Sequence, residues 1–491
     1  MGKHKKLLHF LRPDPAAAAP APAKSSSTTS DDEENDDAYY YCYGAGDTSC
    51  STPTTPSTAA SPYSASPWTQ LPGLGQDALP RGAGAVTGLL GSLVKEGGHV
   101  YSLAAAGELL YTGTDSRNVR VWRDRREQGG FQSGSGLVKA IVVAGDGRVY
   151  TGHQDGKVRV WRRAEGGGDD RPAAAHRRVG SLPRLRDVLR SSLRPSQYVR
   201  TRRHRSALWM RHTDAVSSLS VDAAAGLIYS ASWDRTFKVW RASDSRCLES
   251  VHAHVDAVNA VAAASFDALV LTGSADGTVK VWRRGARGDG KGAAGTWHTM
   301  ERVLREGAGA VTAIAVAVEA RVVYVGSSDG AVAHWQWRRG APPGAAPRNG
   351  GALRGHRMAV LCLAVAGRVI VSGSADRTVS VWRRGEGADH SRLAVLTGHA
   401  GPVKCVAMDQ EEEEGTDDGS APGRWVVYSG SLDGSVKVWR VSDSDRGSGG
   451  IAADLTTATT SARFWKASSP SPLRSWTPYA ATPEPEHMGA A

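Results

Sequence analysis

The chain has 491 residues, with 57 glycines, 15 tryptophans and a net charge of +11. No apolar run approaches the roughly 18 residues that a membrane span requires, and the five cysteines show no CxxC spacing, which argues against structural zinc and favours a reducing compartment. We therefore expect a soluble protein of the cytoplasm, with the nucleus as an alternative. The glycine and tryptophan content favours many short strands joined by tight turns.

The positive charge lies outside the first 80 residues. Residues 1–80 carry five Lys/Arg against nine Asp/Glu, which leaves 55 against 40 in the remainder. A basic body can attract nucleic acid, anionic lipid or acidic proteins, and charge alone does not choose among them.

Both ends of the chain are predicted to be disordered tails. Residues 1–80 are rich in Ala, Pro, Ser and Thr and contain the acidic run Asp31–Asp37, and residues 442–491 have a similar composition without that run. Such segments bury too little apolar surface to offset the entropy lost on ordering. A folded body over residues 85–441 is expected between them.

Within this body a strand-turn-strand pattern ending on tryptophan recurs seven times, as in LTGSADGTVKVWRR (Leu271–Arg284). The seven tryptophans are Trp122, Trp161, Trp240, Trp282, Trp335, Trp382 and Trp439. A further strand beginning with valine precedes each copy, and the second residue after that valine is always small. The small residues are Ser102, Ala140, Ser218, Ala260, Ala313, Cys362 and Cys405. Bulky side chains there would clash where strands converge on an axis.

Four short strands per repeat, seven times over, resemble the WD-repeat (WD40) β-propeller family, and the resemblance covers roughly residues 85–441. It implies an all-β, seven-bladed propeller. In that family an amino-terminal strand completes the last blade, and Ala85–Val94 stands where that strand belongs. Closure of this kind removes the free sheet edges that invite aggregation.

The resemblance also implies a buried, hydrogen-bonded set of His, Ser or Thr, Asp and Trp in each blade. The complete sets are His212, Ser230, Asp234, Trp240; His254, Thr272, Asp276, Trp282; His356, Ser372, Asp376, Trp382; and His399, Ser429, Asp433, Trp439. Three repeats are incomplete, with Glu96, Gly134 and Gly307 in the His place. A His-Asp-Ser grouping has the composition of a catalytic triad, but one that recurs in blade after blade is expected to be structural. No catalytic residue, metal or cofactor is predicted.

Arginine follows six of the seven tryptophans, where the family commonly has aspartate. Because the third strands all end on one face of a propeller, these arginines are expected to form a ring there. The ring is either a surface for an acidic partner or an ordinary solvated rim.

The repeat between Trp161 and Trp240 contains a long basic insertion, residues 164–205. It holds ten arginines between His176 and Arg205, and Leu182, Leu185, Leu189 and Leu193 fall on one helical stripe, which predicts a short amphipathic helix. The candidate binding residues are Arg184, Arg186, Arg190, Arg202 and Arg203. The helix either binds a partner or an anionic surface, or packs its leucines on the propeller while its arginines meet the acidic loop Glu411–Asp418.

The opposite face is where propellers of this family often bind partners. The resemblance places Tyr101, Lys139, Trp233, Leu361, Lys404 and Leu432 there. Trp233 is the strongest candidate because an exposed aromatic side chain is a typical interface anchor.

The stretches VYSLA and YTGTDSRNVRVW, together with the basic insertion, most resemble plant WD-repeat proteins of the JINGUBANG type. This resemblance implies a non-enzymatic scaffold that mediates protein–protein interactions in regulation or signalling. The alternative is binding of RNA or an anionic membrane through the arginine-rich face and the insertion.

Overall fold

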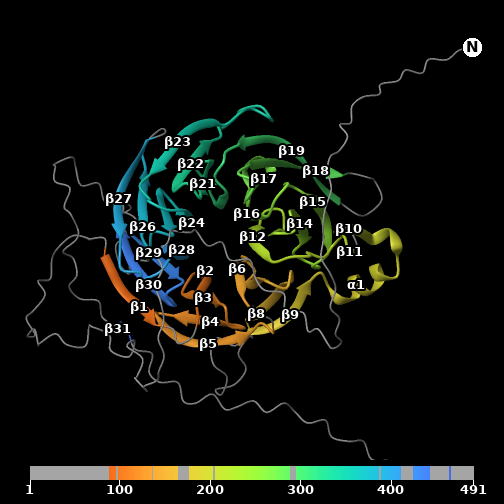
Figure 1. Ribbon diagram of the computed structural model, residues 1–491, viewed down its shortest axis with the longest axis horizontal. Helices are drawn as coiled ribbons and strands as arrows, with labels where there is room; N and C mark the ends of the chain where they lie inside the picture. The colour runs from red at the N-terminus through yellow and green to blue at the C-terminus, as the bar shows by residue number, and fades with distance from the viewer. Residues whose placement is uncertain are drawn as a thin grey trace, which may run out of the picture. The chain divides into compact units, whose positions relative to one another are not determined.

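The computed structural model describes residues 88–94, 98–134, 136–163, 176–202, 205–287, 295–385, 389–410, 424–442 and 464–465, all of which fall in one compact unit, residues 80–491. Seven blades stand around a central axis as a propeller (Figure 1). Six are four-stranded antiparallel sheets, and the seventh has four antiparallel strands and a short fifth strand. The predicted all-β, seven-bladed fold is confirmed.

The innermost strand of each blade begins at the repeated valine. These strands are β2 (Val100–Ala106), β6 (Val138–Val143), β12 (Val216–Asp222), β16 (Val258–Ala264), β20 (Val311–Ala317), β24 (Val360–Ala366) and β28 (Val403–Gln410). Each inner strand contacts the inner strand of the next blade, all the way round the ring.

The small residue in each inner strand is needed because the next blade is so close. Ser102 Oγ donates to the Val138 carbonyl of the neighbouring blade at 2.9 Å. A Cβ on Gly113, opposite Ser102 in the sheet, would lie 2.3 Å from the Ser102 Oγ. The crowding predicted from the sequence therefore comes from blade-to-blade contact.

The second strands carry most of the core. They are β3 (Leu109–Thr114), β7 (Arg148–His153), β13 (Leu227–Ser232), β17 (Leu269–Ser274), β21 (Val322–Ser327), β25 (Val369–Ser374) and β29 (Arg424–Ser431). Four of them, β13, β17, β21 and β25, are buried at every residue, because each is covered by a blade on both faces.

The third strands end on the repeated tryptophan and the residues after it. They are β4 (Asn118–Arg123), β8 (Val158–Arg163), β14 (Thr236–Arg241), β18 (Val279–Arg287), β22 (Ala331–Gln336), β26 (Val379–Arg384) and β30 (Ser435–Ser442).

The outermost strands form the rim of the ring. They are β5 (Arg126–Gln132), β9 (His176–Leu182), β15 (Cys247–His252), β19 (Gly295–Arg305), β23 (Arg348–Arg354), β27 (His390–Leu396) and β1 (Gly88–Val94). In the last blade this place is taken by β1, which pairs antiparallel with β30 from Gly88↔Arg440 to Val94↔Ser435. The expected closure by an amino-terminal strand is confirmed, with the strand beginning at Gly88.

The insertion begins later than predicted. Residues 176–182 are strand β9, the outer strand of the second blade, so Leu182 is buried in the sheet and does not belong to a helical stripe. The residues that leave the blade form helix α1 (Leu185–Ser192), the 3₁₀ helix η1 (Pro195–Gln197) and the hairpin β10 (Tyr198–Arg202) and β11 (Arg205–Leu208), at the outer rim (Figure 1). A second 3₁₀ helix, η2 (Phe266–Ala268), lies in the turn before β17.

The predicted tails lie almost wholly outside the described residues. Of the predicted tail 442–491 the structure describes Ser442, the last residue of β30, and Phe464–Trp465, a two-residue strand, β31, that pairs parallel with β1.

Candidate functional site

The four complete sets have nearly identical geometry. In the third blade His212 Nδ1 lies 2.9 Å from Asp234 Oδ2, His212 Nε2 lies 2.8 Å from Ser230 Oγ, and Trp240 Nε1 donates to the same hydroxyl at 2.9 Å. The corresponding distances are 3.1, 2.8 and 2.9 Å for the set of His254, 3.0, 2.8 and 3.0 Å for that of His356, and 3.0, 2.8 and 2.8 Å for that of His399.

The donors and acceptors are arranged as in a catalytic triad, but the hydroxyl is buried and is shared with the indole. A carboxylate can only accept, so the His Nδ1 proton is donated to Asp234 and the Ser230 hydroxyl donates to Nε2. Ser230 is fully buried, and its oxygen also receives the indole N–H. Burial lowers the pKa of His212. Burial alone would raise the pKa of Asp234, but the hydrogen bonds from His212 and Thr236 outweigh it and lower that pKa. The set is a neutral imidazole between two fixed partners, which suits a structural role.

Two incomplete repeats replace the missing histidine with a side chain from another position. In the second blade His153, on strand β7, is fully buried with Nε2 2.7 Å from Thr151 Oγ1, while Trp161 Nε1 donates to that hydroxyl at 2.9 Å. The aspartate of this repeat, Asp155, is bound by Arg159 at 2.8 Å instead of by a histidine. Burial and the charge of Arg159 lower the pKa of His153 to about 3.

In the fifth blade an arginine takes the place of the histidine. Arg305 donates to the carbonyls of Gly277 and Gly309 at 3.1 and 2.7 Å, and to Ser327 and Asp329 at 3.0 and 3.4 Å. The sequence comparison missed Arg305 because it lies two residues before Gly307, the expected histidine position.

A Tyr–His contact joins neighbouring blades at three places. The tyrosine is on the second strand of one blade and the histidine on the outer strand of the next. The Oη to Nε2 distances are 3.1 Å for Tyr111–His176, 3.3 Å for Tyr229–His298 and 2.9 Å for Tyr324–His390.

In three of the four Trp-Arg-Arg sequences the second arginine belongs to this contact; in the fourth, Trp337-Arg338-Arg339, Arg339 instead donates to the Glu319 carbonyl at 3.3 Å. Arg163, Arg284 and Arg384 pair across the sheet with His176, His298 and His390. Each of these arginines opposes the rise that burial causes in the pKa of the tyrosine in the preceding blade. The best defined is Arg284, whose Nη1 donates to Asp222 at 2.6 Å and to the Tyr229 hydroxyl at 3.4 Å.

The first arginine after the tryptophan is also paired in several blades. Arg123 binds Glu108, Arg241 lies 3.7 Å from Asp244, and Arg283 lies 2.6 Å from Glu301. Carboxylates therefore partly neutralise the expected ring of arginines. The second arginines, Arg163, Arg284 and Arg384, lie at the contacts between blades.

On the opposite face the structure brings three of the predicted partner-binding residues together. Lys139 Nζ lies 4.1 Å from the centre of the Trp233 ring and 5.9 Å from that of Tyr101. Trp233 is 41% exposed. Burial, followed by the nearby charge of Lys404, lowers the pKa of Lys139 to about 8. We call Tyr101, Lys139, Trp233 and Lys404 the aromatic–lysine cluster.

The remaining two candidates of this face are as accessible as Tyr101, Lys139 and Lys404, and less so than Trp233. Leu361 and Leu432 are half-buried, and the Leu432 carbonyl is in contact with the His99 ring.

The candidate arginines of the insertion differ in their surroundings. Arg184 is half-buried and binds Asp187 at 2.8 Å, whereas Arg186 and Arg190 are exposed. Only the backbone of Arg202 is described, and Arg203 and the acidic loop Glu411–Asp418 lie outside the described residues. The leucines do not pack on the propeller: Leu185, Leu189 and Leu193 are 70%, 59% and 84% exposed. The packing of these three leucines on the propeller is therefore contradicted, while the expected meeting of the arginines with the acidic loop lies outside the described residues.

Within the described ranges, no group of three or more His, Cys, Asp or Glu side chains is arranged to hold a metal ion. None of the helices in the described part of the chain combines the length and apolar character that crossing a bilayer demands.

Comparison with known proteins identifies the class. The family model of the WD domain, G-beta repeat, matches residues 205–241, 245–283, 349–383 and 390–440. These are the four repeats with complete His–Ser/Thr–Asp–Trp sets, so over these residues the chain is similar to WD40 repeats, and its seven blades form a propeller. No curated protein matches the chain.

Among solved structures, the chain is similar to the WD40 beta propeller domain of Doa1, with 21% identity and a TM-score of 0.49 over 72% of this chain and 96% of that one.

Proposed function

We propose that the chain is a non-enzymatic scaffold that binds a regulatory protein through the aromatic–lysine cluster. WD40 propellers are commonly protein-interaction scaffolds and usually non-catalytic. The observation that carries the proposal is the exposed Trp233 ring with the Lys139 ammonium 4.1 Å from its centre. Large aromatic side chains with a neighbouring cation are the groups that most often anchor protein interfaces.

The chemistry of the cluster favours an acidic partner segment. Lys139 is partly desolvated and lies near Lys404, so a carboxylate placed between them would relieve the repulsion that contributes to the lowered pKa of Lys139. The indole would at the same time provide apolar area for a side chain flanking that carboxylate.

Quantitative affinity purification tests this assignment. Trp233→Ala and Lys139→Ala should each remove the same proteins from the set that co-purifies with the full chain. The matched control is Trp297→Ala, which removes a tryptophan of similar exposure, 48%, from the outer strand β19. If both cluster variants keep every partner that the control keeps, the binding surface lies elsewhere.

The finer resemblance to plant proteins of the JINGUBANG type is part of the proposal and is supported by three sequence stretches, VYSLA, YTGTDSRNVRVW and the basic insertion. We also propose a cytoplasmic or nuclear location, which the cysteine pattern favours. Immunofluorescence of the tagged full chain in plant cells tests that location, and secretion would contradict it.

A further inference from the structure

We propose that the insertion of the second blade docks on the surface of an anionic lipid bilayer, with the leucines of α1 at the acyl boundary and its arginines on the lipid phosphates. This goes beyond the scaffold function, which uses a different surface.

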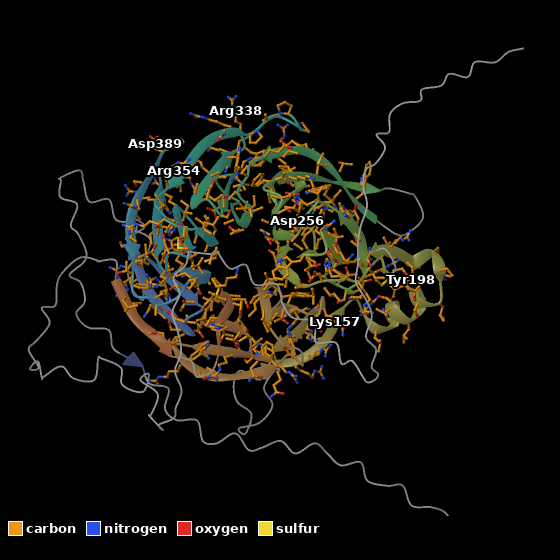
Figure 2. All side chains as sticks on the ribbon, viewed as in Figure 1. Lys157, Tyr198, Asp256, Arg338, Arg354 and Asp389 are labelled. Carbon is orange, nitrogen blue, oxygen red and sulfur yellow. The ribbon has the colours of Figure 1, made fainter. Side chains whose placement is uncertain are left out.

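The first observation is a ridge of exposed leucines. Leu185, Leu189 and Leu193 are spaced by four residues and so project from one side of α1 and its C-cap. Soluble proteins scatter single exposed apolar residues, but a contiguous group indicates a contact surface. Val179, Tyr198 and Val199, on the neighbouring strands, are 53%, 41% and 52% exposed. Figure 2 labels Tyr198 at the outer edge of the ring.

The second observation is that the helix is held with this ridge outward. Ser191 is buried, and Val188 packs on the core cluster that includes Leu182, Leu208 and Met210. Trp209 donates to Gln197 Oε1 at 2.6 Å and fixes the base of the hairpin. The ridge is therefore presented by a fixed element, and binding does not have to order it first.

The third observation is a stripe of arginines beside the ridge. Arg186, Arg190 and Arg194 each follow one of the leucines and are all exposed. The single acidic residue among the described residues 176–208 is Asp187, which lies 2.8 Å from Arg184 and 3.9 Å from Arg186. Long arginine side chains can keep their charge at phosphate level while neighbouring leucines enter the apolar layer.

A groove next to the ridge fits the same ligand chemistry. It has a volume of about 510 Å³ and is lined by Val179, Leu185 and four arginines, Arg148, Arg178, Arg184 and Arg186. Its one carboxylate, Asp244, lies 3.7 Å from Arg241. A lipid phosphate in this groove would sit beside leucines that are already directed to the acyl boundary.

A lipid surface accounts for both the leucine ridge and the arginine stripe, whereas RNA and a protein helix each account for only one of them. RNA binding would use the arginines and leave the leucines in water. A protein helix would need an apolar groove to lie in, but the leucines stand on a helix at the outer rim (Figure 1), and of the three only Leu185 lines the groove, beside four arginines.

Vesicle co-sedimentation of the full chain tests the proposal. The chain should bind vesicles of phosphatidylcholine with about 30% phosphatidylserine and should bind pure phosphatidylcholine far more weakly. The triple variant L185Q/L189Q/L193Q should lower the partition coefficient by at least about 30-fold. The triple variant R186Q/R190Q/R194Q should lower it by about fivefold per arginine at low salt.

The matched control is V255Q/M358Q/V318Q, which removes three apolar side chains that are 74%, 55% and 44% exposed away from the insertion. The control should bind vesicles as the unmodified chain does. The leucine, arginine and control variants should all keep the unfolding midpoint of the unmodified chain. W233A should also keep vesicle binding, which separates this proposal from the scaffold function.

Three results would overturn the proposal. One is equal binding to neutral and anionic vesicles, and another is full binding by the leucine variant. The third is the absence of vesicle binding. In that case, if only the arginine variant loses binding of a single-stranded RNA oligonucleotide, the insertion is an RNA-binding element. If the leucine variant loses co-purifying proteins, the insertion is a protein-binding element.

Discussion

The hydroxyl of Tyr229 lies 3.3 Å from Nε2 of His298, on the outer strand of the next blade. Nδ1 of the same ring lies 2.7 Å from Glu249 Oε2, so the imidazole joins two blades by hydrogen bonds on both of its nitrogens. Replacing Tyr229 with Phe should lower the free energy of unfolding by about 1–3 kcal/mol, because His298 loses a partner while buried. Urea unfolding measures the change. Tyr198→Phe, an exposed tyrosine, is the control and should change it by less than about 0.5 kcal/mol.

The buried sets should be the most sensitive positions of the fold. Ser230→Ala leaves both His212 and Trp240 without their shared hydroxyl and should cost about 1–3 kcal/mol. Trp240→Ala adds a cavity and should cost about 3–5 kcal/mol. Thermal unfolding measures both, and Trp297→Ala, on the exposed rim, should be nearly neutral. A Ser230→Ala protein as stable as the original would contradict the structural role of the set.

Acid should destabilise the propeller well above the usual range of carboxylate protonation. Burial lowers the pKa of His254 to about 4, against the opposing effect of Asp276, while an unfolded histidine titrates near 6.5. The unfolded chain therefore binds this proton more readily, so the stabilisation is complete above pH 6.5 and is lost as the pH falls towards 4, by up to about 3 kcal/mol.

Urea unfolding at a series of pH values should show this slope. His254→Gln should be less stable at pH 7 but should show a shallower slope between pH 6.5 and 4. His252→Gln, two residues away and exposed, is the control and should change the slope far less, because the charge of His252 is the smallest of the effects on the pKa of His254. An unchanged slope in His254→Gln would assign the acid sensitivity to other groups.

Arg305 should be more important than an arginine at the same position one blade later. Arg305 pairs with Val279 across its sheet, and Arg354 pairs with Ala331 in the equivalent place. The next repeat after Arg354 has its own histidine, His356, so Arg354 remains exposed. Arg305→Ala should lower stability by about 2–3 kcal/mol because it leaves a buried serine and two carbonyls without donors. Arg354→Ala (Figure 2) should be almost neutral.

The fold was predictable because its signals are local and repeated. The valine that opens each inner strand, the glycine of six of the seven second strands and the tryptophan of each third strand recur in order, and each has one physical reason. In β13 Ala231 stands in place of the glycine. The four complete sets follow from the same alignment, since their residues are at the same places in each repeat.

The side chains that replace the missing histidines could not be predicted from their position in the repeat. His153 and Arg305 reach the same buried space from other backbone positions, and an alignment that expects histidine at Gly134 or Gly307 cannot find them. The Tyr–His contacts link residues 65, 69 and 66 positions apart. A signal was present, because three of the four Trp-Arg-Arg sequences are followed by an outer-strand histidine and preceded by a tyrosine one blade earlier; the outer strand after Trp337-Arg338-Arg339, β23, has no histidine.

The insertion shows what periodicity leaves open. The leucine spacing correctly indicates a helix, but the same spacing describes a stripe that faces the body or faces away from it. The structure resolves this through Val188 and Ser191, which occupy the inner side. Leu182 was misassigned because an outer strand and the start of a helix follow each other directly.

The pairing of residue 88 with residue 440 also sets an order of events during synthesis. The ring cannot close until β30 has left the ribosome, so β1 is made first among the strands of the propeller and waits for its partner until nearly all of the propeller exists. In that interval the blades already made end in a free sheet edge, and β1 is a free strand able to pair with it or with another chain's. Exchange of β1 between two nascent chains is the misassembly to which this molecule is most exposed.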